Sequence, residues 1–212
     1  MADQPRQLTA PPHAAAHLLQ YHDLIESIVS ALDARDTYTA SHSNRVADMV
    51  LVLAAALGLD PDETALIHIA AHLHDIGKIA VPDAVLRKTG PLTADEWQEM
   101  RRHPVTGYNI LRRVADFQDI AVLVLHHHER WDGRGYPDGL SGDQIPISAQ
   151  VVAMADVYDA LVSKRVYKDA YAPDVAVQMI LHGDCGAFNP LLLDCLTDLQ
   201  DTFKAELAAP EA

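Results

Sequence analysis

Apolar residues recur every three to four positions over most of this chain, which is the spacing of one face of an α-helix. In the first such segment they fall at Leu18, Tyr21, Ile25, Ile28 and Leu32. The stripe has coiled-coil spacing, but it lasts only about two heptads, whereas a firm coiled-coil assignment needs about three to four. Two interpretations stay open: this helix covers the core of its own domain, or it forms a homodimer contact through residues 17–36.

Helix-end signals place the next two helices. One is predicted from Ser41 to Leu57 and ends at Gly58, a residue that suits the position after a helix. The next opens at Asp60-Pro61, with Asp60 as the capping residue and proline in the first turn, and it runs to the pair His74-Asp75.

The second half of the chain continues the helical pattern. Thr93 and Glu96 have the spacing of a capping box, and His103-Pro104 begins another helix with His103 in the extended position before proline. Four further helices are predicted at Val114–His128, Ile147–Leu161, Val175–Leu181 and Leu191–Leu207. No segment has the pattern of a hairpin or a βαβ unit, so the predicted fold class is all-α.

Length and composition indicate one globular domain. The chain has 212 residues, 49% of them hydrophobic and 22% charged, and we assign residues 17–208 to a single helical-bundle domain. Residues 1–16 contain three prolines and no periodic apolar face, so they are predicted to be a disordered leader or linker.

Charge and cysteine content exclude several classes of protein. The net charge of -14 argues against a general binder of nucleic-acid polymers, so an anionic substrate must be held locally by metal ions or a few placed cations. Cys185 and Cys195 are too few for a disulfide framework, which favours a reducing, cytoplasmic location. No signal peptide or membrane-spanning apolar segment is recognisable, and no membrane partner is expected.

Metal-ligating side chains are the main chemical feature. The run His126-His127-His128 stands beside a glycine-rich loop and follows the pair His74-Asp75, while His42 and Asp156 lie on helices predicted to be buried. Imidazoles and carboxylates together suit divalent transition metals, and two such ions can generate hydroxide near neutral pH. A metal-dependent phosphohydrolase is therefore the leading interpretation.

The order of these residues resembles a known family. A His, a His-Asp pair and a late Asp occur in the HD superfamily of metal phosphohydrolases. The resemblance extends to its HD-GYP subfamily, whose members hydrolyse the bacterial second messenger cyclic di-GMP, and it covers the chain from about Tyr21 to Pro190. The motifs that carry it are His74-Asp75-Ile76-Gly77-Lys78, His103-Pro104, His127-His128-Glu129 and Gly135-Tyr136-Pro137.

The resemblance implies a binuclear metal centre bridged by Asp75. One metal would be held by His42, His74, Asp75 and Asp156, and the other by Asp75, His103, His127 and His128. Some family members hold a third metal through a Glu four residues before the first His, but Tyr38 occupies that position here. Iron or manganese is the metal that the resemblance implies, and the same ligands also accommodate zinc, nickel or cobalt.

The resemblance also assigns residues to the substrate. Lys78 would act beside Asp75 at the scissile phosphate, and Tyr136, Arg165 and Lys168 would hold the nucleotide phosphates. Taken without the family, Lys78 is an exposed helix-end lysine, and Arg165 and Lys168 are solvated charges. The loop glycines serve either substrate approach or a tight turn, and these alternatives stay open.

Other polar residues receive bland interpretations. Glu129 and Asp159 are expected to orient imidazoles or cap helices rather than to bind metal. His126 is expected to lie outside the site. The remaining histidines, which include His22, His68, His72 and His182, are expected to be ordinary packed or exposed residues.

The function implied by the resemblance is hydrolysis of cyclic di-GMP to pGpG, and onward to GMP, by in-line attack of a hydroxide shared by the two metals. Such an enzyme would affect biofilm formation and motility. One alternative is a phosphohydrolase acting on another nucleotide or cyclic dinucleotide. Another is a signalling module with vestigial hydrolysis that binds a cyclase or adaptor through the Gly-Tyr-Pro loop. The family usually carries a receiver or sensor domain, so the chain either stands alone or is a fragment.

Overall fold

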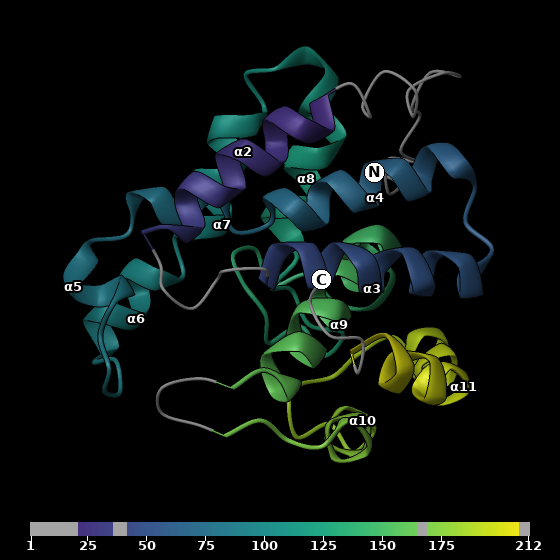
Figure 1. Ribbon diagram of the computed structural model, residues 1–212. Helices are drawn as coiled ribbons and strands as arrows, with labels where there is room; N and C mark the ends of the chain where they lie inside the picture. The colour runs from purple at the N-terminus through teal and green to yellow at the C-terminus, as the bar shows by residue number, and fades with distance from the viewer. Residues whose placement is uncertain (1–20, 36–41, 165–168, 208–212) are drawn as a thin grey trace, which may run out of the picture.

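The computed structural model describes residues 21–35, 42–164 and 169–207, and within these ranges every regular element is a helix (Figure 1). The all-α prediction is confirmed. The predictions for residues 1–16, for Tyr38 and for Arg165 and Lys168 lie outside the described residues. The α-helices are α2 (His22–Asp33), α3 (His42–Leu57), α4 (Pro61–Leu73), α5 (Asp83–Leu86), α6 (Ala94–Met100), α7 (His103–Leu111), α8 (Gln118–His126), α9 (Ile147–Val162), α10 (Pro173–Leu181) and α11 (Pro190–Leu207). The 3₁₀-helices are η2 (Ile76–Ala80), η3 (Ala115–Phe117) and η4 (Gly142–Gln144).

The chain reverses tightly between α3 and α4. Gly58 has a φ of 66°, and the backbone N–H groups of Gly58 and Leu59 donate to Ala55 and Ala54, which closes α3 with a Schellman motif. Asp60 then accepts hydrogen bonds from two backbone N–H groups of the first turn of α4, each at 2.9 Å. The two helices consequently lie side by side, as the end signals in the sequence predict (Figure 1).

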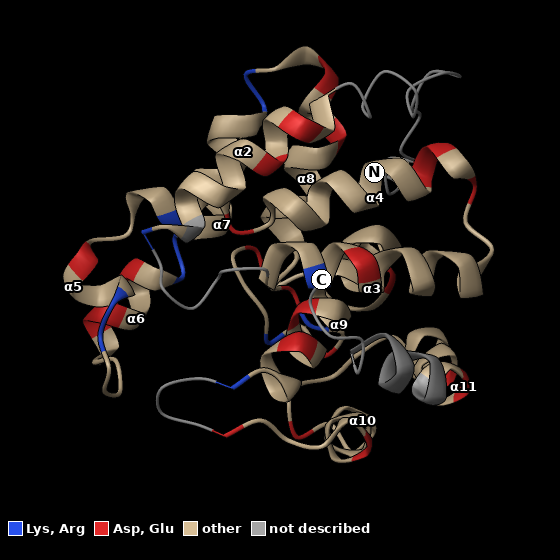
Figure 2. Cartoon of the chain, viewed as in Figure 1, with Lys and Arg blue, Asp and Glu red and all other residues tan. Residues whose placement is uncertain are grey.

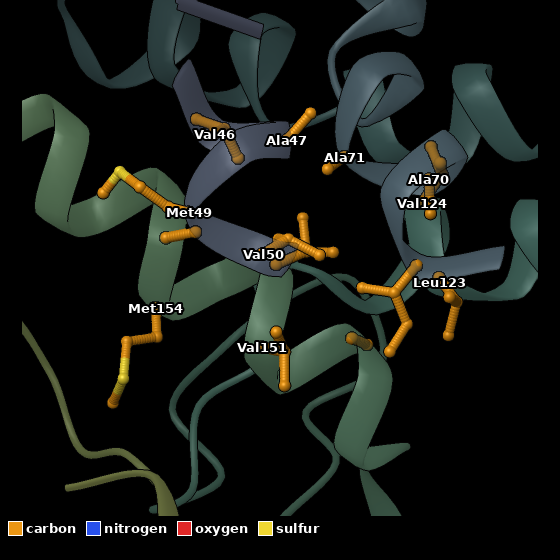
Figure 3. Packing of buried hydrophobic residues seen from close by; sticks show 14 of the residues in the cluster. Val46, Ala47, Met49, Val50, Ala70, Ala71, Leu123, Val124, Val151 and Met154 are labelled. Carbon is orange, nitrogen blue, oxygen red and sulfur yellow. The ribbon is translucent and has the colours of Figure 1, made fainter. Parts of the chain in front are cut away.

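The core is formed where α3, α4, α8 and α9 meet. Val50, Ala71, Leu123 and Val151, one from each of these helices, are completely buried (Figure 3). Burying a side chain of valine or leucine size contributes about 1.5–3 kcal/mol. Except for His103, which begins α7, the residues predicted to bind metal lie on these helices or directly after them, so the packed core fixes their positions.

One predicted helix is shorter than expected. The segment Val114–His128 begins with the separate turn η3, and only Gln118–His126 forms α8. Val114 is extended, with a ψ of 125°, and its carbonyl accepts from the backbone N–H of Phe117 and from the Gln118 side chain. That carbonyl is therefore used in a turn, which prevents one continuous helix.

The prediction for His103 is wrong in its backbone conformation. We expected an extended residue before Pro104, but His103 is the first residue of α7. Its Nδ1 atom is 2.8 Å from the carbonyl oxygen of Met100, at the end of α6. This contact holds His103 in the turn between the two helices and outweighs the preference of a residue before proline for extended backbone.

Close packing joins the segment after α4 to α7. A Cβ atom on Gly77, in η2, would lie 1.9 Å from the carbonyl oxygen of His103, so only glycine fits there. From the other side, the Arg35 guanidinium at the end of α2 donates to the carbonyls of Ile79 and Val81, at 2.6 and 2.7 Å. The segment that carries Asp75 and Lys78 is therefore clamped between α2 and α7.

Acidic and basic side chains are distributed differently over the fold. Asp and Glu are spread over most of the helices, and Lys and Arg occur in fewer places (Figure 2). Among the described residues no helix is both long and apolar enough to cross a bilayer.

Candidate metal centre

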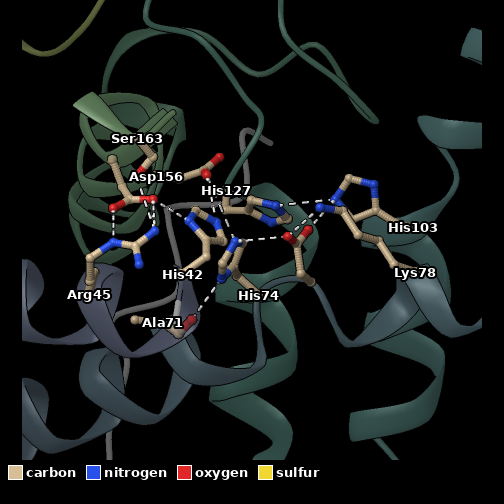
Figure 4. Close-up of polar contacts among 11 residues, drawn as sticks. His42, Arg45, Ala71, His74, Lys78, His103, His127, Asp156 and Ser163 are labelled. Carbon is tan, nitrogen blue, oxygen red and sulfur yellow. Dashed lines mark hydrogen bonds and ion pairs between the residues drawn. The ribbon is translucent and has the colours of Figure 1, made fainter. Parts of the chain in front are cut away.

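The residues predicted to bind metal converge in the structure although they come from five helices or helix ends. Two groups have ligand atoms within 4.8 Å of one another: His42, His74 and Asp75 form the first, and His103, His127 and His128 form the second. Figure 4 shows His42, His74, His103 and His127 side by side. The remaining predicted ligand, Asp156 on α9, has its Oδ1 atom 3.3 Å from His42 Nε2 and 3.9 Å from His74 Nε2. All seven predicted ligands are thus in one place.

Asp75 lies between the two groups. Its Oδ2 atom is 3.3 Å from His74 Nε2, and its Oδ1 atom is 3.4 Å from His103 Nε2. The Lys78 Nζ atom is 2.5 Å from Oδ2. One carboxylate therefore contacts an imidazole of each group and a cation, which is the geometry that a bridging ligand needs.

Helix ends orient the imidazoles. His74 and His127 occupy the C-terminal caps of α4 and α8, where the last backbone carbonyls have no partner within the helix. Their Nδ1 atoms are each 2.7 Å from such a carbonyl, three residues earlier, at Ala71 and Val124. His103 makes the same contact with Met100 at the end of α6. A carbonyl only accepts, so each Nδ1 carries the proton and each Nε2 keeps its lone pair for the centre.

His42 is oriented by a carboxylate instead. Its Nδ1 atom is 2.6 Å from Asp159 Oδ2, and the guanidinium of Arg45 donates to the same carboxylate (Figure 4). The expectation that Asp159 orients an imidazole agrees with this contact. A carboxylate behind a histidine is the usual arrangement around protein-bound transition metals, because it fixes the ring and strengthens its basicity.

Burial sets the protonation of the second group. It lowers the pKa of His128 to about 3 and that of His103 to about 4, and it holds the pKa of His127 well below its usual range. These imidazoles are therefore neutral at pH 7, as a metal ligand must be.

The first group is dominated by its carboxylates. Burial lowers the pKa of His42, but the hydrogen bonds and charges of Asp156 and Asp159 outweigh it and raise the pKa to about 9. For the Asp75 carboxyl, burial raises the pKa, but the charges of Lys78 and His74 outweigh burial and hold the pKa well below its usual range. The carboxylate oxygens are charged, and His74 Nε2 is buried without a hydrogen bond. Convergent Nε2 atoms, ionised carboxylates and this unsatisfied nitrogen fit divalent metal ions.

The candidate centre opens into a cavity of about 980 Å³. Its wall includes Lys78 and Tyr136, and the Tyr136 ring stacks on His128 with centroids 4.8 Å apart. The Arg101 guanidinium lies 4.4 Å from the centroid of the same ring. Tyr136 is thus held between an imidazole and a cation at the edge of the candidate centre.

Several wall residues were missed by sequence reasoning. Arg45, Lys88, Trp97 and Lys164 line the cavity, and Trp97 is about half exposed there. Arg45 had a usable signal, because it lies one helical turn after His42. The others come from separate segments with no recognisable motif, and only the fold brings them to the cavity.

The Gly-Tyr-Pro loop is held by Glu129. This buried carboxylate accepts backbone N–H bonds from Asp138, Gly139 and Leu140, at 2.7, 3.1 and 3.1 Å. It thus organises the loop backbone rather than an imidazole of the centre. A Cβ on Gly135 would lie 2.4 Å from the Glu129 Cα, so this glycine is required by close backbone packing. His126 belongs to neither ligand group and lies 3.9 Å from Glu129 and from Asp138.

The arrangement has known relatives. Residues 23–185 match the family model described as HD domain. The chain belongs to the HD domain family, in its HD-GYP group.

Individual relatives agree with this assignment. The cyclic di-GMP phosphodiesterase response regulator RpfG of Xanthomonas campestris is 43% identical over 82% of this chain and 47% of its own length. The 3'3'-cGAMP-specific phosphodiesterase 2 of Vibrio cholerae is 40% identical over 86% of this chain and 35% of its own length. The chain therefore spans about half, or less, of these curated relatives.

A solved structure shares the fold. The cyclic GMP-AMP-specific phosphodiesterase V-cGAP3 of Vibrio cholerae superposes with a TM-score of 0.68 at 20% identity, over 88% of this chain and 50% of that chain. At this identity the likeness concerns the fold alone.

Proposed function

We propose that this chain is a metal-dependent phosphodiesterase that opens cyclic di-GMP to linear pGpG and continues to GMP. The observation that carries the proposal is the convergence of seven predicted ligand side chains, five of which line a cavity that also contains cations. The relative at 43% identity is named for cyclic di-GMP hydrolysis. The cavity volume lies at the upper end of the usual range for small-molecule sites, which suits a ligand of two nucleotides.

The ligands divide between two metal ions. His42, His74, Asp75 and Asp156 would hold one, and Asp75 with the second imidazole group would hold the other. Iron or manganese suits this mixture of nitrogen and oxygen donors, and zinc, nickel or cobalt would also be accommodated. When bound, such a pair supplies Lewis acidity and lowers the pKa of water.

The chain's own residues position the substrate. Lys78 places a positive charge 2.5 Å from the shared carboxylate, where it stabilises charge that develops on the phosphate. Tyr136, which lies beside His128 on the cavity wall, is a predicted contact of the nucleotide phosphates. Arg45, Lys88 and Lys164 bring further cations to the cavity wall, although Arg45 is paired with Asp159 and Lys88 with Glu96. Arg165 and Lys168, one and four residues after Lys164, remain predicted phosphate contacts.

A second candidate substrate is 3'3'-cGAMP. The relative at 40% identity is named for that molecule, and it differs from cyclic di-GMP in one base only. Both substrates present the same phosphodiester ring to the metal centre, so the proposed chemistry is unchanged. A cytoplasmic location and a cyclase or adaptor at the Gly-Tyr-Pro loop are the associated proposals.

A substrate panel tests the proposal. The chain, purified and loaded separately with Fe²⁺, Mn²⁺ and Zn²⁺, is incubated with cyclic di-GMP, 3'3'-cGAMP and cyclic di-AMP, and the products are separated by ion-exchange chromatography. We expect pGpG from cyclic di-GMP. His74→Ala abolishes this product, whereas the exposed His182→Ala retains it. Absence of a linear product from every dinucleotide and metal overturns the proposal, and hydrolysis of 3'3'-cGAMP alone replaces the substrate but not the chemistry.

A further inference from the structure

A second cluster of histidines lies between α2 and α4, apart from the candidate metal centre. His68 and His72 are four residues apart on α4 and therefore share a face of that helix. His22 is the first residue of α2, which packs against α4. The sequence analysis treated these residues as ordinary packed or exposed histidines. The structure places ligand atoms of all three within 4.8 Å of one another.

The distances within this cluster match those of a metal site. The Nε2 atom of His68 is 3.4 Å from Nε2 of His22 and 3.3 Å from Nε2 of His72. In a tetrahedral zinc site with Zn–N bonds of about 2.0–2.1 Å, two ligand nitrogens are separated by about 1.63 bond lengths, or about 3.3–3.4 Å. Both nitrogen pairs therefore have the separation that a shared ion imposes.

Hydrogen bonding alone leaves this cluster poorly satisfied. The His68 Nδ1 atom is 3.3 Å from the carbonyl oxygen of Ala47, so Nδ1 carries the ring proton and Nε2 has a single lone pair. Both His22 and His72 direct Nε2 at that one lone pair, which accepts only one donor in good geometry. An ion among the three nitrogens accepts a lone pair from each ring instead.

The surroundings favour a cation. Glu26, one turn after His22, has a carboxylate oxygen 3.9 Å from His22 Nδ1, on the side of the ring away from the cluster. At 3.9 Å this is a charge contact and not the 2.6 Å hydrogen bond that Asp159 makes with His42, but it places a negative charge behind a ring that would bind a cation. The side chain of His22 is 28% exposed, which gives an ion and a water molecule access from solvent.

We infer that His22, His68 and His72 bind one divalent transition-metal ion of the zinc class through their Nε2 atoms, with the fourth position open to water. Three neutral imidazoles suit zinc, copper, nickel or cobalt rather than magnesium or calcium. The ion would join α2 to α4 two residues before His74. It is a structural clamp that fixes the first described helix against the helix leading into the candidate metal centre.

Metal counting tests this inference. The whole chain is stripped of metal, dialysed to equilibrium against Zn²⁺, and analysed by mass spectrometry of the elements. We expect His22→Ala and His68→Gln each to bind one zinc equivalent fewer than the wild type, and His182→Ala to bind as many. The deficit of one zinc equivalent should persist when His22→Ala is combined with Asp75→Asn and compared with Asp75→Asn alone. Asp75→Asn weakens only the candidate metal centre.

Two spectroscopic measurements sharpen the test. Co²⁺ in the Asp75→Asn protein should give the visible absorption of tetrahedral cobalt, and His22→Ala should remove it. Zn²⁺ should raise the melting temperature of Asp75→Asn by several degrees more than that of the double variant Asp75→Asn/His22→Ala. Circular dichroism verifies that both metal-free proteins are folded. If His22→Ala and His68→Gln bind as many zinc ions as the wild type, the cluster is only a hydrogen-bonded histidine group and the inference is overturned. No measurement involves a nucleotide, so the result is independent of the proposed function.

Discussion

The two halves of the candidate metal centre are equally buried but electrostatically opposite. In the half formed by His42, Asp156 and Asp159, carboxylates raise the pKa of the imidazole to about 9. In the half formed by His103, His127 and His128, the charge of Asp75 does not outweigh desolvation: the pKa of His103 falls to about 4 and that of His128 to about 3, and the pKa of His127 lies well below its usual range.

The comparison shows that burial alone does not decide the charge of a ligand. Desolvation opposes the protonated imidazole in both halves, but an adjacent carboxylate reverses the outcome in one of them. The first half can neutralise itself as a hydrogen-bonded ion pair in the absence of metal. The second half is an array of neutral lone pairs, and Asp75 is the residue that joins the two.

The largest effect should come from removing the charge that both halves share. Asp75→Asn keeps the size of the side chain but removes its negative charge and leaves one oxygen atom, instead of two, to bind metal. We expect the variant to bind two fewer divalent ions than the wild type. Its loss of activity should exceed the loss of about 10- to 100-fold that is typical when a residue that only orients a metal ligand is changed. Elemental analysis and the hydrolysis assay measure this. Asp138→Asn, which changes an exposed carboxylate in the loop, is the matched control, and an unchanged metal content in Asp75→Asn would contradict the bridging role.

The connection between the halves can also be broken sterically. Gly77→Ala would place a Cβ 1.9 Å from the His103 carbonyl oxygen and push η2 away from α7. We expect a loss of about 1–3 kcal/mol in the free energy of unfolding, as for other overpacked sites, with weaker metal binding in both halves. Urea denaturation measures the first effect. Gly90→Ala is the control, since nothing lies within 4 Å of a Cβ there; equal stability of the two variants would be inconsistent with the close contact.

A change confined to one half should separate the two. Asp159→Asn removes the charge behind His42 but leaves the second group untouched. The expected result is an affinity about 10- to 100-fold lower for one of the two ions and an unchanged affinity for the other, as seen by calorimetric titration. Ser163→Ala alters the same polar network, through Arg45, without touching an imidazole, and should resemble the wild type. Equal weakening of both ions in Asp159→Asn would show that the halves are not independent.

The smallest effect is on the pH dependence of the metal-free protein. As pH falls below the ordinary histidine value of 6.5, unfolded His103 and His128 take up protons that the folded state excludes down to about 4 or lower, so stability falls. Folded His42 keeps its proton up to a pH of about 9, whereas unfolded His42 loses it near 6.5. The stabilisation that His42 provides is therefore fully present below pH 6.5 and is lost as the pH rises to about 9. Melting temperatures should therefore peak near neutral pH. His42→Ala should flatten the alkaline side, and an unaltered alkaline slope would refute the assignment.

Local patterns were sufficient for most of the helices and for the turn between α3 and α4. Asp60 and Gly58 act through neighbours within five residues, so the sequence contains the whole interaction. His103 was misassigned because its contact with the preceding helix competes with a local rule. Arg35 was overlooked for a similar reason, since its partners are more than forty residues away.

The candidate site followed from a different kind of information. The order of His42, His74-Asp75 and Asp156 matched a family, and the structure brings those residues together, although their binding of metal stays a prediction. The cluster at α2 and α4 had no motif. Its pair His68 and His72 is visible at helical spacing, but His22 joins them only through tertiary packing.

The single carboxylate of Glu129 has a mechanical consequence. Glu129 follows His127 and His128 in the chain, and it grips three successive amides of the loop that begins with the Gly-Tyr-Pro tripeptide. The loop is therefore tied by hydrogen bonds to the residue that follows the second ligand group. We expect a displacement of the loop to be transmitted through Glu129 to His127 and His128. A protein that bound the loop would then change the geometry of the second ligand group.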